Sequence, residues 1–202
     1  FKKKNSRFLE VDGTLVHYVD EGEGMSIILL HGTGSSLHTW DLWAERLKNK
    51  YRVLRITLPG FGLSGPRFDK KYKIKDYVNL LENFVEKIGV EKFHLVGNSL
   101  GGSIAWLYSS FYDKKVSKLV LINSSGFELD EVPFVIKIAR NNYLNFLIKK
   151  TSPKYLVKKS LKEVYYNDKL ISKSIINRYY KLSLRQGNRQ AFIDRSLINF
   201  TD

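Results

Sequence analysis

The fold is decided by residues 92–102, which read KFHLVGNSLGG. The first half is a short apolar run, typical of a buried strand, and the second half places a serine between two glycines. A helical pattern continues through residues 103–111. The stretch therefore predicts a strand, a tight turn that carries Ser99, and a helix that begins at Leu100, which is the context of a G-x-S-x-G motif.

This turn gives Ser99 the position of a nucleophile. A sharp turn after a strand holds the serine in a strained backbone conformation, and Gly97 and Gly101 keep side chains out of its way. The helix that begins at Leu100 directs its N-terminal amides at the place where negative charge would develop. A chance occurrence of the motif is the alternative, but the predicted strand and helix on either side favour Ser99 as the catalytic residue.

A second glycine-rich turn follows an earlier apolar run. Residues 27–30 read IILL, the pattern of a strand covered on both faces, and residues 31–34 read HGTG directly after it. We expect the backbone amides of Thr33 and Leu100 to form an oxyanion hole, with Gly34 as the alternative donor. The competing interpretation is a turn that only ends the strand. The predicted substrate-binding residues are Gly32, Gly34 and Asn98.

Apolar runs and helical patterns alternate through the first 129 residues. Residues 7–20 alternate apolar with polar side chains around Asp12-Gly13, which predicts an antiparallel hairpin. Further strands are expected at 27–30, 51–58, 93–97 and 116–122, with helices at 40–47, 74–88 and 103–111. Strands that alternate with helices form a mostly parallel sheet. The predicted fold class is therefore α/β, with an N-terminal antiparallel hairpin.

From about residue 130 the pattern changes to helices without intervening strands. Helical spacing runs through 165–185 and 188–200, and Ser152-Pro153 is the expected start of another helix. We therefore predict two parts, a sheet-containing core at residues 1–129 and a helical cap, or lid, at residues 130–202.

Composition limits the kinds of site that the chain can hold. The 202 residues are 43% hydrophobic, enough for one sizeable core, and the lack of cysteine excludes disulfides and thiolate metal sites. No metal-ligand cluster or nucleotide-binding loop is apparent, so we expect no metal and no cofactor. The formal net charge is +14, but no nucleic-acid-binding motif accompanies it. We expect no nucleic-acid partner.

Four stretches together resemble the α/β-hydrolase fold superfamily, in particular its serine esterases and meta-cleavage C–C hydrolases. In chain order they are residues 31–34 (HGTG), 58–64 (LPGFGLS), 97–102 (GNSLGG) and 118–122 (KLVLI). The resemblance implies an α/β-hydrolase fold in which residues 130–202 are the cap inserted over the active site. It also argues against dehalogenase-like and epoxide-hydrolase-like members, which carry aspartate where this chain has Ser99.

Within this group the sequence favours an ester or a similar acyl substrate. The pair Asn98-Ser99 resembles the C–C hydrolases, but the turn at 33–36 lacks the proline that those enzymes usually carry there. We therefore expect a small-molecule acyl substrate to be cleaved through a Ser99 acyl-enzyme, with C–C bond hydrolysis as the alternative. A catalytically inactive hydrolase-fold binding protein is the further alternative.

The base that would activate Ser99 is not apparent. In this fold an acid and then a histidine follow the serine in sequence. The four histidines all precede it: His17, His31, His38 and His94. His38 is the one that we consider near the cleft, and Asp194 and Asp202 receive no catalytic role. We expect a C-terminally truncated chain, with the triad Asp and His beyond residue 202 and little activity in the fragment itself.

The predicted cap contains a basic amphipathic stretch at residues 134–150. Its apolar side chains alternate with Lys137, Arg140, Lys149 and Lys150, a pattern that suits weak contact with an anionic membrane. The alternative, which we favour, is an apolar face that packs on the sheet edge and lines the substrate pocket. No run of about 18 apolar residues is present. A cytoplasmic location is expected, with a leader or anchor before Phe1 as the alternative; the oligomeric state is not indicated.

Overall fold

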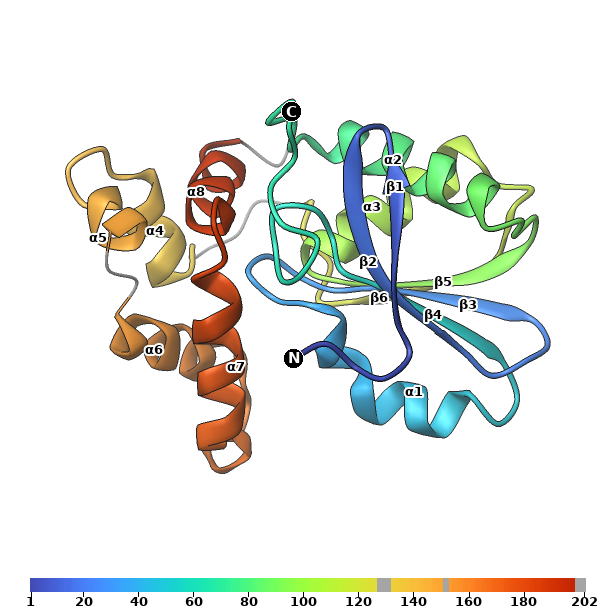
Figure 1. The fold of residues 1–202 in the computed structure, drawn as a ribbon, viewed down its shortest axis with the longest axis horizontal. Helices are drawn as coiled ribbons and strands as arrows, with labels where there is room; N and C mark the ends of the chain where they lie inside the picture. Colours follow the sequence, from blue (N-terminus) through green and yellow to red (C-terminus); the bar gives the residue numbers. More distant parts are fainter. Residues whose placement is uncertain (127–131, 151–152, 199–202) are drawn as a thin grey trace.

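The computed structural model describes residues 1–126, 132–150 and 153–198, with six strands in one sheet in the order β1-β2-β4-β3-β5-β6 (Figure 1). The bounds are β1 (Ser6–Val11), β2 (Thr14–Glu21), β3 (Ser26–Leu30), β4 (Arg52–Ile56), β5 (Phe93–Asn98) and β6 (Val116–Ile122). β2 is antiparallel to β1 and β4, and the other pairs are parallel. The predicted α/β class, with its N-terminal hairpin, is confirmed.

The hairpin between β1 and β2 turns at the two residues that the sequence marks. Asp12 and Gly13 have φ values of 51° and 68°, so both central residues are left-handed. Turns of this kind match the right-handed twist of the strands that they join.

The central strand β3 is buried on both faces, as its apolar run predicts. Ile28 and Leu30 pack in one hydrophobic cluster with residues of α2 (Ile74–Lys87) and α3 (Leu100–Phe111). Ile27 and Leu29 face the opposite way and pack with Trp40, at the end of η1 (Leu37–Trp40), and with α1 (Asp41–Leu47). Helices therefore cover both faces of the sheet, α1 on one and α2 with α3 on the other (Figure 1).

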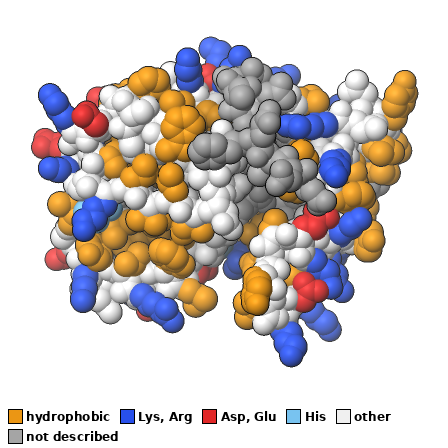
Figure 2. Space-filling view, turned by 180° about the vertical axis from the view of Figure 1, so that it is seen from behind, with side chains coloured by type: hydrophobic (Ala, Val, Ile, Leu, Met, Phe, Trp, Pro, Cys, Tyr) orange, Lys and Arg blue, Asp and Glu red, His pale blue; other side chains and the backbone are white. Residues whose placement is uncertain are grey.

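Strand β6 has the predicted bounds but an unexpected environment. Its unbroken apolar end is typical of a strand covered on both faces, yet β6 is the last strand of the sheet. Leu119, Val120 and Leu121 keep about two-fifths of their surface exposed, at 39%, 42% and 44%. Hydrophobic side chains also gather on the sheet side of the molecule in the view from behind (Figure 2). Within the described residues, β6 pairs with β5 along one edge and has no strand along its other edge.

A layer of helices, called the helical layer below, follows the sheet in sequence and lies beside it (Figure 1). Its elements are α4 (Phe134–Arg140), α5 (Asn145–Lys150), α6 (Lys154–Val164), η2 (Asp168–Leu170), α7 (Lys173–Ser183) and α8 (Asn188–Leu197). A small cluster of Ile138, Ala139, Ile148 and Ile193 joins α4, α5 and α8. Within the described residues, no helix has both the length and the apolar character to cross a bilayer.

The bounds of the helical layer differ from the prediction in detail. The helix expected at 165–185 begins only at Lys173, because Ser172 caps it by accepting a hydrogen bond from the Ile175 amide (3.2 Å). Pro153 is the N-cap residue of α6 and lies just outside the helix, whereas Ser152 falls outside the described residues. The predicted boundary between residues 129 and 130 also falls outside them, so the division into two parts stays a prediction.

Candidate active site

Ser99 lies in the turn between β5 and α3. Its φ of 51° and ψ of −117° fall in a backbone region that residues other than glycine seldom occupy. Two hydrogen bonds hold this conformation: the Ser99 amide donates to the Ile122 carbonyl (3.1 Å), and the Ser125 amide donates to the Ser99 carbonyl (3.2 Å). The strained turn is therefore fastened to the end of β6, with Ser99 half-buried at the carboxyl edge of the sheet.

Gly97 and Gly101 permit this turn because the backbone packs closely at both positions. A Cβ added at Gly97 would lie 2.1 Å from the Gly101 carbonyl oxygen. A Cβ at Gly101 would lie 2.3 Å from the Leu30 carbonyl oxygen. Both separations are far shorter than any van der Waals contact, so neither position has room for a side chain.

His31 fixes the loop that follows β3. Its Nε2 accepts a hydrogen bond from the Leu58 amide (2.9 Å), so the proton is on Nδ1, which donates to the Gly32 carbonyl (2.7 Å). Complete burial lowers the pKa of His31 to about 4. The imidazole is therefore neutral at pH 7 and acts as a structural bridge between the loops after β3 and β4.

The two amides predicted as the oxyanion hole belong to segments that meet near Ser99. Thr33 lines the same cavity as Ser99, and a Cβ added at Gly32 would lie 3.0 Å from the Ser99 Cβ. Leu100 is the first residue of α3, whose leading amides have no partner inside the helix. Within the described residues, neither the Thr33 amide nor the Leu100 amide donates a hydrogen bond to the protein. Their role as donors to an oxygen atom of a ligand stays a prediction.

The three predicted substrate-binding residues are placed differently. Gly34 lines the cavity with a φ of 72°, and a Cβ there would lie 3.3 Å from the Phe192 ring. Gly32 lies beside Ser99 but does not line the cavity. The Asn98 side chain turns toward β6, where Nδ2 donates to the Ile122 carbonyl (3.1 Å), so its role in substrate binding stays a prediction.

A cavity of about 280 Å³ lies between the sheet and the helical layer. The loops after β3, β4, β5 and β6 form its base and contribute, among others, Thr33, Phe61, Ser99 and Asn123. Parallel strands bring the loops at their carboxyl ends together, which is where open α/β sheets bind ligands. Ser99 therefore faces a cavity large enough for a small molecule.

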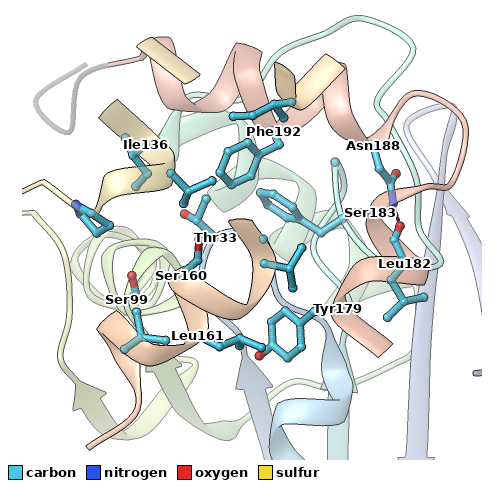
Figure 3. Close-up of a pocket in the computed structure, with 18 of the residues that line it drawn as sticks. Thr33, Ser99, Ile136, Ser160, Leu161, Tyr179, Leu182, Ser183, Asn188 and Phe192 are labelled. Carbon is cyan, nitrogen blue, oxygen red and sulfur yellow. Dashed lines mark hydrogen bonds between the residues drawn. The ribbon is translucent and has the colours of Figure 1, made fainter. Parts of the chain in front are cut away.

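The helical layer supplies mostly apolar walls to this cavity. Six of these side chains are Ile136, Leu156, Val157, Leu161, Leu182 and Phe192. Figure 3 shows Ser99 on one side of the cavity and Leu182, Ser183 and Asn188 on the other. Among the described lining residues there is no carboxylate, and Arg189 is the one charged side chain. The sequence did not single out these residues, since apolar helical spacing marks a buried face but not what that face contacts.

The turn between α7 and α8 fastens the helical layer to the loop after β4. Asn188 Nδ2 donates to the carbonyls of Gly62 (3.0 Å) and Leu182 (2.8 Å). Arg185 donates to the Leu63 carbonyl (2.6 Å). Because Gly62 and Asn188 both line the cavity, these contacts also fix the distance between two of its walls.

His17, His31 and His38 have hydrogen-bond partners other than Ser99, whereas the buried Nδ1 of His94 has none within the described residues. His17 bonds to the Thr57 hydroxyl (3.1 Å), and His38 bonds to the Phe1 carbonyl (2.9 Å). Burial lowers the pKa of both, that of His17 to about 4. In the part of the chain that the structure describes, no hydrogen bond joins any of the four imidazoles to Ser99.

Asp194 and Asp202, two acidic residues of the predicted cap, receive no catalytic role from the sequence. Asp194 accepts a hydrogen bond from Gln190 on its own helix (2.7 Å), and Asp202 lies outside the described residues. Within the described part of the chain, no group of His, Asp and Glu side chains is arranged to hold a metal ion.

Comparison with known proteins matches residues 26–147 to the family described as alpha/beta hydrolase fold. Epoxide hydrolase 4 from Mus musculus is 32% identical over 55% of the chain and 32% of its own length. The 2-hydroxy-6-oxononadienedioate/2-hydroxy-6-oxononatrienedioate hydrolase from Klebsiella pneumoniae is 32% identical over 58% of the chain and 44% of its own length. The chain thus spans about a third to a half of these curated relatives.

A solved structure resembles nearly the whole chain. The meta-cleavage product hydrolase from Pseudomonas fluorescens superposes with a TM-score of 0.77 at 25% identity, covering 94% of this chain and 70% of that one. The similarity therefore includes the helical layer as well as the sheet, because the sheet and its helices end at Ile122.

Proposed function

Because the chain belongs to the α/β-hydrolase fold family, we propose that it carries the nucleophile of a serine hydrolase that cleaves an ester or a similar acyl substrate. The observation that carries the proposal is the strained turn of Ser99, beside two unpartnered amides and at the base of a mostly apolar cavity. A hydrolase of this kind needs these three features together, namely a presented nucleophile, donors for the oxyanion and a dry binding space.

In the proposed reaction, Ser99 Oγ attacks the carbonyl carbon of the bound ester. The amides of Thr33 and Leu100 donate to the oxygen as it becomes negative, each worth about 3 to 4 kcal/mol of barrier. The serine proton passes to the base, and the alcohol leaves with it as the acyl-enzyme forms. Water then attacks the acyl carbon, which releases the acid and restores Ser99.

The base and its acid partner come, on this proposal, from sequence beyond residue 202. In the described residues Ser99 has no histidine partner, although the fold requires one after the serine. The uncovered apolar edge of β6 supports the same idea, because further strands would pair there. Residues 1–202 alone should then show little turnover, since a serine without its base is a poor nucleophile.

The lining of the cavity favours an apolar, uncharged acyl group. Leu161 and Phe192 would contact it, and the lining residues described here include no carboxylate to bind a cation. The similarity to epoxide hydrolase 4 does not favour epoxide opening, because an epoxide hydrolase of this fold would carry aspartate where this chain has Ser99.

Cleavage of a C–C bond is the second candidate. It is favoured by the 32% identity to the Klebsiella hydrolase and by the fold match to the Pseudomonas enzyme. The Klebsiella hydrolase is named for a nonadienedioate and a nonatrienedioate, and such compounds carry carboxylates. Arg189, the one charged lining residue, would be the group available to bind a carboxylate here.

The test uses the full-length protein and a fluorophosphonate probe, which reacts with activated serines. We expect labelling of wild type and none of Ser99→Ala. The matched control is Ser160→Ala, which removes another serine hydroxyl from the same cavity and should be labelled as wild type is. Absence of labelling in wild type would favour the inactive binding protein instead.

Substrate class is then decided by turnover. Short p-nitrophenyl esters should be hydrolysed faster than a 2-hydroxy-6-oxo-dienoate, and the reverse order would establish the second candidate. Esters with aliphatic acyl groups should exceed those with charged ones, because the cavity walls are apolar.

A further inference from the structure

The positive charge of the chain is concentrated in the helical layer. Residues 132–198 contain 15 Lys and Arg against 3 Asp and Glu, whereas residues 1–126 contain 19 against 13. The formal net charge of the helical layer is therefore about twice that of the sheet part, although the sheet part is much longer. Such a concentration produces a local field that attracts anionic surfaces.

The helices α5 and α6 also carry exposed aromatic side chains. In Figure 1, α4, α5 and α6 lie farther from the sheet than α7 and α8, although α4 and α6 also line the cavity, and we call this side of the helical layer its outer side. Four aromatic side chains on α5, α6 and their adjoining turns are half exposed or more: Tyr143 (87%), Phe146 (50%), Tyr155 (70%) and Tyr166 (fully exposed). Exposed aromatic rings of this kind are typical of side chains that lie at a membrane interface.

The lysines on the same elements are mostly without acidic partners. Lys149, Lys150 and Lys158 are exposed and form no ion pair within the described residues. Lys162 is the exception, because it pairs with Asp168. Lys and Arg side chains stand beside hydrophobic ones on this layer in the space-filling view (Figure 2). Three lysines at least are thus available to anionic groups outside the protein.

The apolar cavity reaches the surface at the end of α6. Val164 lines the cavity and is nevertheless 67% exposed. Tyr166 is two residues further along the chain, so one of the exposed aromatic residues is close in sequence to this opening. An apolar molecule that leaves a bilayer next to α6 would therefore meet the cavity without crossing much water.

We propose that the outer side of the helical layer, defined by Tyr143, Phe146, Lys149, Lys150, Tyr155, Lys158 and Tyr166, docks on an anionic lipid bilayer. The lysines bind lipid phosphates, and the aromatic rings enter the headgroup region. The aromatic rings and the apolar opening distinguish a bilayer from a nucleic acid, which offers phosphates but no apolar phase to cover Val164.

The experiment is co-sedimentation of the full-length protein with vesicles of phosphatidylcholine alone or mixed with phosphatidylglycerol. Wild type should bind the mixed vesicles and not the neutral ones. Binding should fall as salt rises from 0.1 to 1 M, because the screening length shrinks from about 10 to about 3 Å. Equal binding to both vesicles, or none to either, would overturn the proposal.

Two variants locate the surface. The triple variant Lys149→Glu, Lys150→Glu and Lys158→Glu should weaken binding at least ~100-fold, since each lysine near an anionic surface contributes about fivefold. The pair Tyr143→Ser and Tyr166→Ser should weaken it with little change in the salt dependence. All five side chains are exposed, so the fold should survive, which thermal unfolding would check.

A matched control separates this surface from overall charge. Lys71→Glu, Lys75→Glu and Lys92→Glu change the net charge equally but lie on the sheet part, also exposed. This control should bind as wild type does, and an equal loss would overturn the proposal. Ser99→Ala should also bind unchanged, so the result does not depend on whether the proposed reaction occurs.

Discussion

The sheet and the helical layer share one cavity but are stabilised in different ways. The sheet packs on two faces with clusters that include fully buried rings such as Phe84 and Phe93. The helical layer has a core of four small or aliphatic residues and many exposed aromatic ones. Ser99 and the two unpartnered amides belong to the sheet part, whereas most of the apolar walls of the cavity belong to the layer. Rigid backbone thus positions the proposed chemistry, and side chains shape what it acts on.

The largest expected difference between the two regions is in the catalytic effect of a substitution in each. Ser99→Ala in the full-length protein should lower kcat about 10⁶-fold, because the acyl-enzyme cannot form. Phe192→Ala should lower kcat/KM only about tenfold to a hundredfold, because it removes an apolar contact with the substrate. Both are measured with p-nitrophenyl esters, and equal losses would show that the layer takes part in the chemistry itself.

Acid pH should weaken the sheet part specifically. His17 and His31, both fully buried in the sheet part, have pKa values lowered to about 4. The unfolded chain binds these protons near pH 6.5, so stability is complete above that pH and falls as the pH drops toward 4. Each histidine should contribute a slope of about 1.4 kcal/mol per pH unit.

Urea unfolding of the full-length protein between pH 7 and 4 measures this slope. In His17→Gln the slope should decrease, since glutamine does not titrate. A slope unchanged by the substitution would mean that His17 is not responsible for the acid sensitivity.

Core packing should also distinguish the regions. Phe84→Ala, in the sheet cluster, should lower the free energy of unfolding by about 3 to 5 kcal/mol. Ile138→Ala, in the small cluster of the layer, should cost about 2 kcal/mol, the low end for such changes, because few residues surround it. Urea unfolding of both variants measures these changes. A larger loss of unfolding free energy for Ile138→Ala than for Phe84→Ala would contradict the prediction.

The smallest predicted effect concerns a helix cap in the layer. Ser172 accepts a hydrogen bond from the Ile175 amide at the start of α7 (3.2 Å). Ser172→Ala should cost about 1 kcal/mol, the usual contribution of a capping serine. Ser172→Gly, which keeps the backbone conformation, should cost only a few tenths in the same thermal unfolding measurement.

The sequence predicts the sheet better than the cavity, for physical reasons. The bounds of β6 and the turn at Ser99 follow from local patterns, since apolar runs and paired glycines act over a few residues. The exposure of β6 does not, because it depends on which strands lie beside it. The cavity walls are the least predictable part from sequence. Asn188 and Phe192 lie about 90 residues after Ser99 in the chain, and the packing of α8 brings them to the same cavity.

The latch between Arg185, Asn188 and the loop after β4 has a consequence for protein engineering. All of its acceptors are main-chain carbonyls, those of Gly62, Leu63 and Leu182. A carbonyl is present whatever side chain its residue carries, but the loop must still keep its glycines: a Cβ at Gly65 would lie 2.2 Å from Arg185 Nη1, and a Cβ at Gly62 would lie 2.7 Å from Thr57 Cγ2. Residues 132–198 could therefore be grafted only onto a sheet whose loop follows the same path and keeps these glycines, and the graft would transfer the walls of a cavity whose base the new sheet supplies.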